Sequence, residues 1–204
     1  MARLCPEGLG GPAPTPRDGT HPVGPSQLSV QARAENRATS DDARAQVGFW
    51  TAVLSRAKAE FAPERMYLRH EPRTGVHVWH TVPSSPGDIG WQMWVTAGGS
   101  WLCLRINSTE DGQAETQHYY DQLVQSREEI DAAFGEGLDW IARDDLTNRQ
   151  LRWDNPVRGG YRSEPTEWEA AADSLVAGLR RLVDATRRPV MNLTPYVAAE
   201  LPID

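Results

Sequence analysis

Two histidines are the residues of this chain whose side chains are best suited to hold a metal ion. His77 and His80 stand three positions apart in a segment that alternates apolar and polar residues. In a β-strand, side chains an odd number of positions apart point to opposite faces, so these imidazoles are not expected to share one ion. Neither a Cys-x-x-Cys nor a His-Glu-x-x-His motif accompanies them. We therefore interpret both as ordinary strand histidines and predict no metal site.

The acidic pair Asp144-Asp145 is the second candidate, because nucleases hold metal ions with paired carboxylates. Two-metal hydrolysis of a phosphodiester usually requires further acids, and the common restriction-type core adds a lysine. Lys58 is the only lysine of the chain and lies far upstream. The run Asp144–Asn148 has the composition of a polar turn between two strands. We predict a turn there and no catalytic residue.

Cys103 is the third candidate. It lies between Leu102 and Leu104, where a small packed residue is expected rather than a nucleophile. The sequence contains neither a Gly-x-Ser-x-Gly motif nor a phosphate-cradling Gly-Lys-Ser/Thr motif. We therefore expect no catalytic residues and no cofactor, with an uncharacterised enzyme as a remaining alternative.

The length and charge of the chain limit the classes to which it can belong. Its 204 residues allow one domain with a substantial core. A formal net charge of −7 disfavours non-specific binding to nucleic acid or to anionic membranes. No stretch is apolar over the length of a signal peptide or a membrane span. We expect a cytoplasmic protein without membrane contact.

The elements that would position these residues follow from the periodicity of the apolar side chains. Residues 1–40 are rich in Gly and Pro and are predicted to form a disordered leader. Residues 41–193 are predicted to form a single domain, and residues 194–204 a loose tail. The elements expected in that domain are a helix from Ser40–Asp42 to Pro63, strands 76–82, 91–97 and 101–106, a helix 113–134 capped by Gly135, strands 138–143 and 149–154, and a helix from Thr166, with a Glu169 capping box, to Pro189.

The order of these elements, α-β-β-β-α-β-β-α, predicts the fold class. Short loops between successive strands imply antiparallel pairing. We therefore expect a two-layer α+β domain, in which an antiparallel sheet of about five strands packs on the helices. The helical stripes place Trp50, Trp168 and Leu179 in its core.

The alternation in the first three strands separates a wholly apolar face from a mixed one. The mixed face carries tryptophans among polar residues: His77, Trp79, Thr81, Gln92, Trp94, Thr96, Trp101, Cys103 and Arg105. Such a face suits a partner-binding surface or a platform for stacked bases. The alternatives are that a helix of this chain covers it, or that the tryptophans are scattered on an ordinary sheet surface. The candidate binding residues are Trp79, Trp94, Trp101, Arg105 and His77.

Three groups of residues suggest a family. They are Phe49-Trp50-Thr51-Ala52 on the first helix, the stretch from Tyr120-Asp121-Gln122-Leu123 through Glu128-Glu129-Ile130 and Phe134-Gly135-Glu136 to Leu138-Asp139-Trp140, and the Trp168 helix closing on Arg187-Arg188-Pro189. Together they resemble a bacterial and archaeal family, domain of unknown function 4268, over roughly Gln46 to Leu193. In that family the domain often follows an endonuclease-like domain, so the resemblance implies an accessory role near nucleic-acid chemistry. The family supplies no catalytic residues.

These observations favour a non-catalytic interaction module, an accessory component of a nuclease or defence system. A protein partner or self-association is expected before nucleic acid, because the chain is acidic. The alternatives are a nucleic-acid-binding accessory domain that uses Trp79, Trp94, Trp101 and Arg105, and the uncharacterised enzyme mentioned above.

Overall fold

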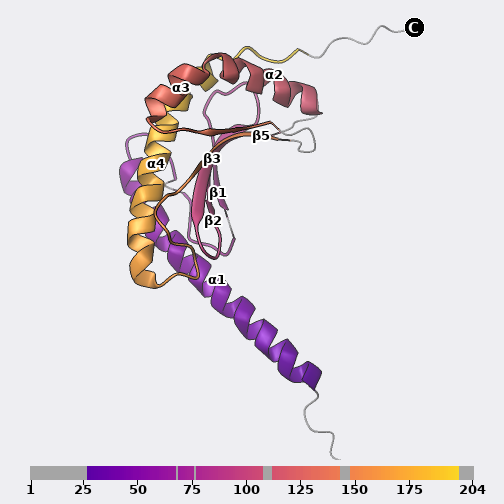
Figure 1. Ribbon diagram of the computed structural model, residues 1–204, viewed down its shortest axis with the longest axis vertical. Helices are drawn as coiled ribbons and strands as arrows, with labels where there is room; N and C mark the ends of the chain where they lie inside the picture. Colours follow the sequence, from indigo (N-terminus) through magenta and orange to yellow (C-terminus); the bar gives the residue numbers. More distant parts are fainter. Residues whose placement is uncertain (1–26, 68, 76, 108–111, 143–147, 198–204) are drawn as a thin grey trace, which may run out of the picture. The chain divides into compact units, whose positions relative to one another are not determined.

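A computed structural model describes residues 27–67, 69–75, 77–107, 112–142 and 148–197, with side chains from Thr39 onward (Figure 1). The chain divides into two units, Met1–Arg37 and Ala38–Asp204, and the second holds the sheet. The elements of the described residues are α1 (Gln27–Glu60), β1 (His77–Thr81), β2 (Ile89–Val95), β3 (Ser100–Ile106), α2 (Gly112–Gln125), α3 (Arg127–Phe134), β4 (Asp139–Ile141), β5 (Arg149–Asp154) and α4 (Pro165–Met191).

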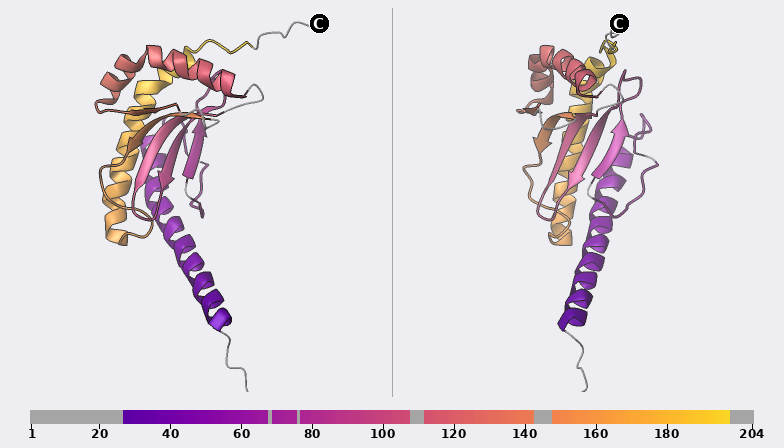
Figure 2. Two further views of the ribbon diagram at one scale, coloured as in Figure 1. Left: turned by 45° about the vertical axis from the view of Figure 1, so that its right-hand side comes forward. Right: turned by 90° about the vertical axis from the view of Figure 1, so that its right-hand side faces the viewer.

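The strands form one five-stranded sheet in the order β1-β2-β3-β5-β4, and every pair is antiparallel. The predicted α+β class is therefore confirmed, with nearly the predicted element order. The part of α1 from Thr39 onward and α4 both lie on one face of this sheet (Figure 2). Within the described residues, no helix is long and apolar enough to cross a bilayer.

The core fills the space between these two helices and the inner face of the sheet. Trp91 and Met93 on β2 and Leu104 on β3 are completely buried there, as are Trp50 on α1 and Leu179 on α4. Alternation explains this, because residues two apart in a strand share a face. The one polar atom of each buried tryptophan is satisfied, since Trp91 Nε1 donates to Thr186 Oγ1 (3.0 Å) and Trp50 Nε1 to the Gly75 carbonyl (2.7 Å).

Gly178 lets α4 approach the sheet closely. A Cβ atom at this position would lie 2.6 Å from Cζ3 of Trp153, whose ring packs against the helix backbone. Glycine in a helix costs up to about 1 kcal/mol relative to alanine, and here it makes room for a large aromatic contact.

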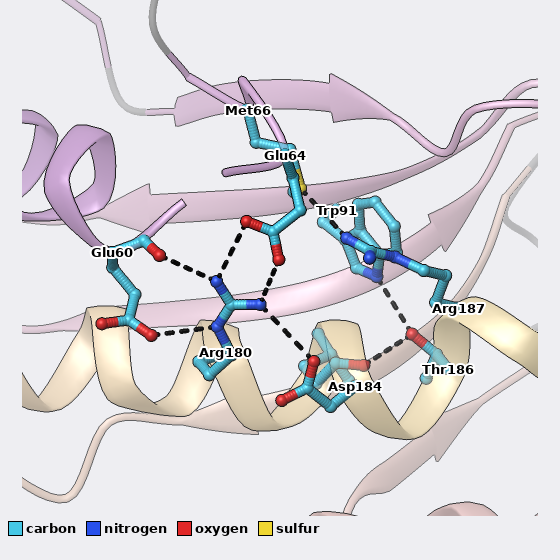
Figure 3. Close-up of polar contacts among 9 residues, drawn as sticks. Glu60, Glu64, Met66, Trp91, Arg180, Asp184, Thr186 and Arg187 are labelled. Carbon is cyan, nitrogen blue, oxygen red and sulfur yellow. Dashed lines mark hydrogen bonds and ion pairs between the residues drawn. The ribbon is translucent and has the colours of Figure 1, made fainter. Parts of the chain in front are cut away.

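A guanidinium group joins the end of α1 to α4 (Figure 3). Arg180 donates to Glu60 Oε1 (3.0 Å), to the Glu60 carbonyl (2.9 Å) and to Glu64 Oε1 (2.8 Å), and it lies 3.5 Å from Asp184. Its Cζ atom also stands 4.0 Å from the centroid of the Phe61 ring. The hydrogen bond from Arg180 lowers the pKa of Glu64. Arg180 thus donates hydrogen bonds both to the last residue of α1 and to the loop that follows this helix.

The first helix begins earlier than the sequence suggested. We expected its start at Ser40–Asp42, whereas α1 begins at Gln27. The intervening residues, 27–40, include Ala, Gln, Arg and Glu and contain neither Gly nor Pro, so their intrinsic preference is helical. The rest of the predicted leader, residues 1–26, lies outside the described residues.

The helix predicted over residues 113–134 is two helices. Ser126 leaves the helical conformation (φ −100°, ψ 13°), and its N–H bonds to the Leu123 carbonyl at 2.9 Å. The break lets α2 bury Leu123 and α3 bury Ile130 and Phe134 on differently oriented axes. The capping role predicted for Gly135 is confirmed, because it adopts φ 83° at the end of α3.

Both predicted ends of the last helix are wrong. Pro165 occupies its first turn after Glu164, with no side-chain capping bond, so the capping box at Thr166 does not form. At the other end, α4 runs past Pro189 to Met191. A proline near the end of a helix removes one hydrogen bond at a position where pairing is already ending, and its cost is small there.

The core position predicted for Trp168 also needs correction. This side chain is only half-buried, and its Nε1 donates to the Gly160 carbonyl (3.0 Å). The helical stripe placed it on the correct side of α4, but the first turn of the helix extends beyond the sheet-facing core.

The tail predicted as loose is anchored at its start. The Thr194 N–H bonds to Gln122 Oε1 (2.8 Å), and the Tyr196 N–H bonds to the Tyr119 hydroxyl (3.2 Å). Residues 198–204 lie outside the described part of the chain.

We expect Leu179→Ala to lower the free energy of unfolding by about 2–5 kcal/mol, because it leaves a cavity between α4 and the sheet. Met191→Ala is the matched control, since Met191 lies on the same helix and is 54 % exposed. Its cost should stay below roughly 0.5 kcal/mol. Urea denaturation measures both, and equal losses would contradict the described packing.

Candidate functional site

The face of the sheet turned away from α1 and α4 is here called the open face (Figure 2). The strand register places all five candidate binding residues on it. The strand register defines its members as His77, Trp79 and Thr81 on β1, Gly90, Gln92 and Trp94 on β2, Trp101, Cys103 and Arg105 on β3, Gln150, Arg152 and Asp154 on β5, and Asp139 and Ile141 on β4. The three tryptophans, His77 and Arg105 are each half-buried.

Four flat side chains stack across four strands of the open face. The ring centroids of His77 and Trp94 are 4.6 Å apart, and those of Trp94 and Trp101 are 4.8 Å apart with an interplanar angle of 6°. The guanidinium carbon of Arg152 lies 4.2 Å from the centroid of the Trp101 ring. We call His77, Trp94, Trp101 and Arg152 the aromatic ladder. It forms because His77 pairs with Trp94, and Trp94 with Trp101, in register.

The geometry of the ladder decides which parts of its rings remain available. Neighbouring strands lie about 4.8 Å apart, and this distance matches the spacing of the rings. Each ring therefore stands on the sheet above its own strand, with its broad faces turned toward the neighbouring rings. Trp94 has His77 on one side and Trp101 on the other, and Trp101 has Trp94 and Arg152. The broad faces of both tryptophans are therefore occupied, and only their edges can meet another molecule.

Two polar side chains next to the ladder, Gln92 and Cys103, are buried. Trp94 Nε1 donates to Gln92 Oε1 (3.0 Å), and the Cys103 thiol donates to the same oxygen at 3.9 Å. Gln92 is 5 % exposed and Cys103 completely buried. Burial raises the pKa of the Cys103 thiol to about 12. The group is therefore a packed thiol, protonated at neutral pH, and does not supply a nucleophile.

Trp79 is held differently from the other two tryptophans. Its ring lies over Gly90, where a Cβ atom would come within 2.4 Å of Trp79 Cζ2, so only glycine permits this approach. Its Nε1 donates to Thr81 Oγ1 (3.0 Å). One side of the ring rests on the sheet, and the half-buried side chain turns its other side outward.

Arg105 lies on the central strand, β3, in the same row of the open face as Thr81, Gly90 and Gln150. Burial lowers the pKa of His77, and the charges of Arg73 and Arg105 lower it further. Burial raises the pKa of the Cys103 thiol, and the charge of Arg105 opposes that effect. The Nε atom of Arg105 is buried and has no hydrogen-bond partner in the described part of the chain.

The remaining candidates from the sequence lie elsewhere. His80 points to the inner face, as predicted from its spacing to His77, with ring centroids 5.1 Å from Tyr67 and 6.3 Å from Trp91. Asp144 and Asp145 lie outside the described residues. Among those described, no three His, Cys, Asp or Glu side chains are grouped so that they could hold a metal ion.

Arg152 is the member of the aromatic ladder that was not predicted from the sequence. Alternation places it on one face of its strand, but only the pairing of β5 with β3 puts that face beside Trp101. At this end of the ladder a shallow pocket of about 320 Å³ includes Trp101, Arg152 and Arg158 in its lining. Chemically, the open face offers aromatic edges, one flat tryptophan ring and arginine charges, a set suited to recognition.

The histidines make the stability of the fold depend on pH. Burial lowers the pKa of His70, His77 and His80 below the usual 6.5, because it disfavours the charged imidazole. Such groups stabilise the fold above their unfolded pKa, and that stabilisation is lost as pH falls. We expect the free energy of unfolding to decrease from about pH 7.5 to about pH 5.5, as measured by urea denaturation.

His80→Gln should make that decrease shallower, since it removes one of the three groups. The described carboxyl groups whose pKa values are lowered are Asp42, Glu64 and Glu136; their ordinary values are 3.8, 4.5 and 4.5, so they act at lower pH. A free energy of unfolding that stays constant or rises between these two pH values would show that the histidines are not held neutral by the fold.

Comparison with curated proteins and with solved structures finds no match. A protein family does match, over residues 45–190, and this range includes the second half of α1, the whole sheet and nearly all of α4. The open face and every residue of the aromatic ladder lie inside it. The chain therefore belongs to the family described as domain of unknown function, DUF4268.

Proposed function

We propose that this domain is a non-catalytic interaction module that binds a protein partner through the open face. The observation that carries the proposal is the aromatic ladder, with Arg105 on the same face, on a side of the sheet that α1 and α4 leave uncovered. Tryptophan and arginine dominate the binding energy of protein interfaces more than other residues do.

The packing of the ladder supports recognition at low entropic cost. Each member is already restrained, since Trp94 is stacked on both sides and hydrogen-bonded to Gln92. Immobilising a free side chain at an interface costs about 0.5–1.5 kcal/mol. Side chains that are ordered before binding avoid much of this cost, and a partner would meet a surface that is already formed.

The ladder favours a protein over single-stranded nucleic acid. Stacking of bases requires free ring faces, and those of Trp94 and Trp101 are occupied by their neighbours. The net charge of −7 also opposes a polyanion. A nucleic-acid-binding role is the second candidate, because the outward side of the Trp79 ring, near Arg105, could stack one base.

A role beside a nuclease or in a defence system is a narrower form of the same proposal. It rests on the association with endonuclease-like domains that the family resemblance implies, and the match to the family supports it for that reason. Self-association through the open face belongs to the same class of function, and sedimentation of the chain at increasing concentration distinguishes it.

We expect Trp79→Ala and Trp101→Ala to weaken binding of a partner by at least about tenfold, or ~1.4 kcal/mol. The partner is obtained by affinity capture and then purified, and its Kd is measured by calorimetry. Trp101→Ala should also cost about 0.5–1.5 kcal/mol of stability for each stacking interaction that the substitution removes, and the variant should still unfold cooperatively.

Trp168→Ala is the matched control, because Trp168 is another half-buried tryptophan and lies on α4, away from the open face. It should leave the Kd unchanged. If it weakens binding as much as the open-face variants do, or if those variants bind normally, the open face is not the interface.

A further inference from the structure

Arg105 is a partly desolvated cation on β3, the central strand of the open face. Its Nε atom is buried, and no hydrogen bond or ion pair with another described residue involves its guanidinium. The contrast with Arg152 is direct, because the guanidinium of Arg152 contacts Asp154 Oδ1 at 2.6 Å and 2.9 Å. An unpaired arginine of this kind costs free energy in the isolated fold, since the protein replaces part of its water shell without supplying an acceptor.

The open face does not share the acidic balance of the whole chain, because its two arginines, Arg105 and Arg152, are matched by two aspartates, Asp139 and Asp154. The chain carries −7, yet Arg105 and Arg73 both act on His77, and Arg158 stands with Arg152 at the pocket beside Trp101. The carboxylates in the register of this face are Asp154, which Arg152 engages, and Asp139 on the short edge strand. Around Arg105, which no carboxylate of the described residues engages, the face is therefore locally complementary to a negatively charged group.

Resting on the proposed function, we propose that the occupant of the open face is an acidic protein segment that places an aspartate or glutamate carboxylate on the guanidinium of Arg105. An adjacent apolar side chain of that segment packs on the outward side of the Trp79 ring. The carboxylate contacts the part of Arg105 that stays open in this half-buried residue.

Two physical effects strengthen this contact. Part of the desolvation of Arg105 has already taken place in the free protein, so binding a carboxylate requires less further loss of water. Burial of its Nε atom also places Arg105 in a less polar environment than bulk water, and a charge pair is stronger there. A protein carboxylate is favoured over a phosphate chain because the stacked rings of Trp94 and Trp101 present edges and no free faces for bases.

The test uses a display library of random twelve-residue peptides selected against the full chain, followed by synthesis of the enriched peptides. We expect these peptides to be acidic and to contain a large apolar residue. Arg105→Gln should raise the Kd by about tenfold or more, and Arg105→Lys should raise it less, because the charge is kept. Arg188→Gln, which changes an exposed arginine on α4, should leave the Kd unchanged.

A double-mutant cycle identifies the contact itself. Replacing the critical acid of a peptide by its amide should weaken binding to the unaltered protein as much as Arg105→Gln does, and it should add little to the effect of Arg105→Gln. Near-ultraviolet circular dichroism of the stacked Trp94–Trp101 pair shows whether each variant keeps the ladder.

Each contrary outcome has a distinct meaning. Enriched peptides that are neutral or basic, or that ignore Arg105→Gln while responding to Trp79→Ala, overturn the acidic segment and leave the open face as an interface. Peptides insensitive to Trp79→Ala and Trp101→Ala, or no enrichment at all, count against both proposals. Competition by a single-stranded oligonucleotide that depends on Arg105 makes nucleic acid the occupant and overturns the acidic segment.

Discussion

The in-register antiparallel pairing of β2 with β3 is the constraint on which both faces of this domain depend. The same register that places Trp94 opposite Trp101 on the open face places Trp91 opposite Leu104 in the core. A slip of one residue would exchange the two faces of a strand and expose the core set. The burial of the inner face, where Trp91, Met93 and Leu104 are all inaccessible, therefore also fixes the spacing of the ladder.

The helices explain why the outer side of the sheet is left for recognition. Trp91 Nε1 bonds to Thr186 on α4, and Arg180 on α4 bonds to Glu60 on α1, so both helices are held on the inner side (Figure 3). Gly178 deepens this contact by admitting Trp153. A two-layer domain of this kind covers one side of its sheet only. The polar and aromatic residues of the open face pack mainly against one another.

The sequence was informative where the signal is local and periodic. Alternation of period two placed Trp79, Trp94 and Trp101 on one face of three strands, and the helical stripe placed Leu179 in the core, because both periods are read within a few residues. Strand order is a different kind of information. Nothing near Arg152 shows that β5 lies beside β3 rather than at an edge, so the last member of the ladder could not be predicted. The errors at helix ends have a related origin, because Pro189 is a helix breaker in isolation, yet burial of Val190 in the core outweighs the missing hydrogen bond.

The two ends of the aromatic ladder differ in charge, and this difference bears on what the open face can recognise. Arg152 at one end is a permanent cation whose carboxylate partner is Asp154. At the other end His77 is held neutral, since burial and the charges of Arg73 and Arg105 lower its pKa. A protonated imidazole there would add a third positive charge next to two arginines. The positive charge that the open face offers to an acidic occupant therefore comes from its arginines and not from His77.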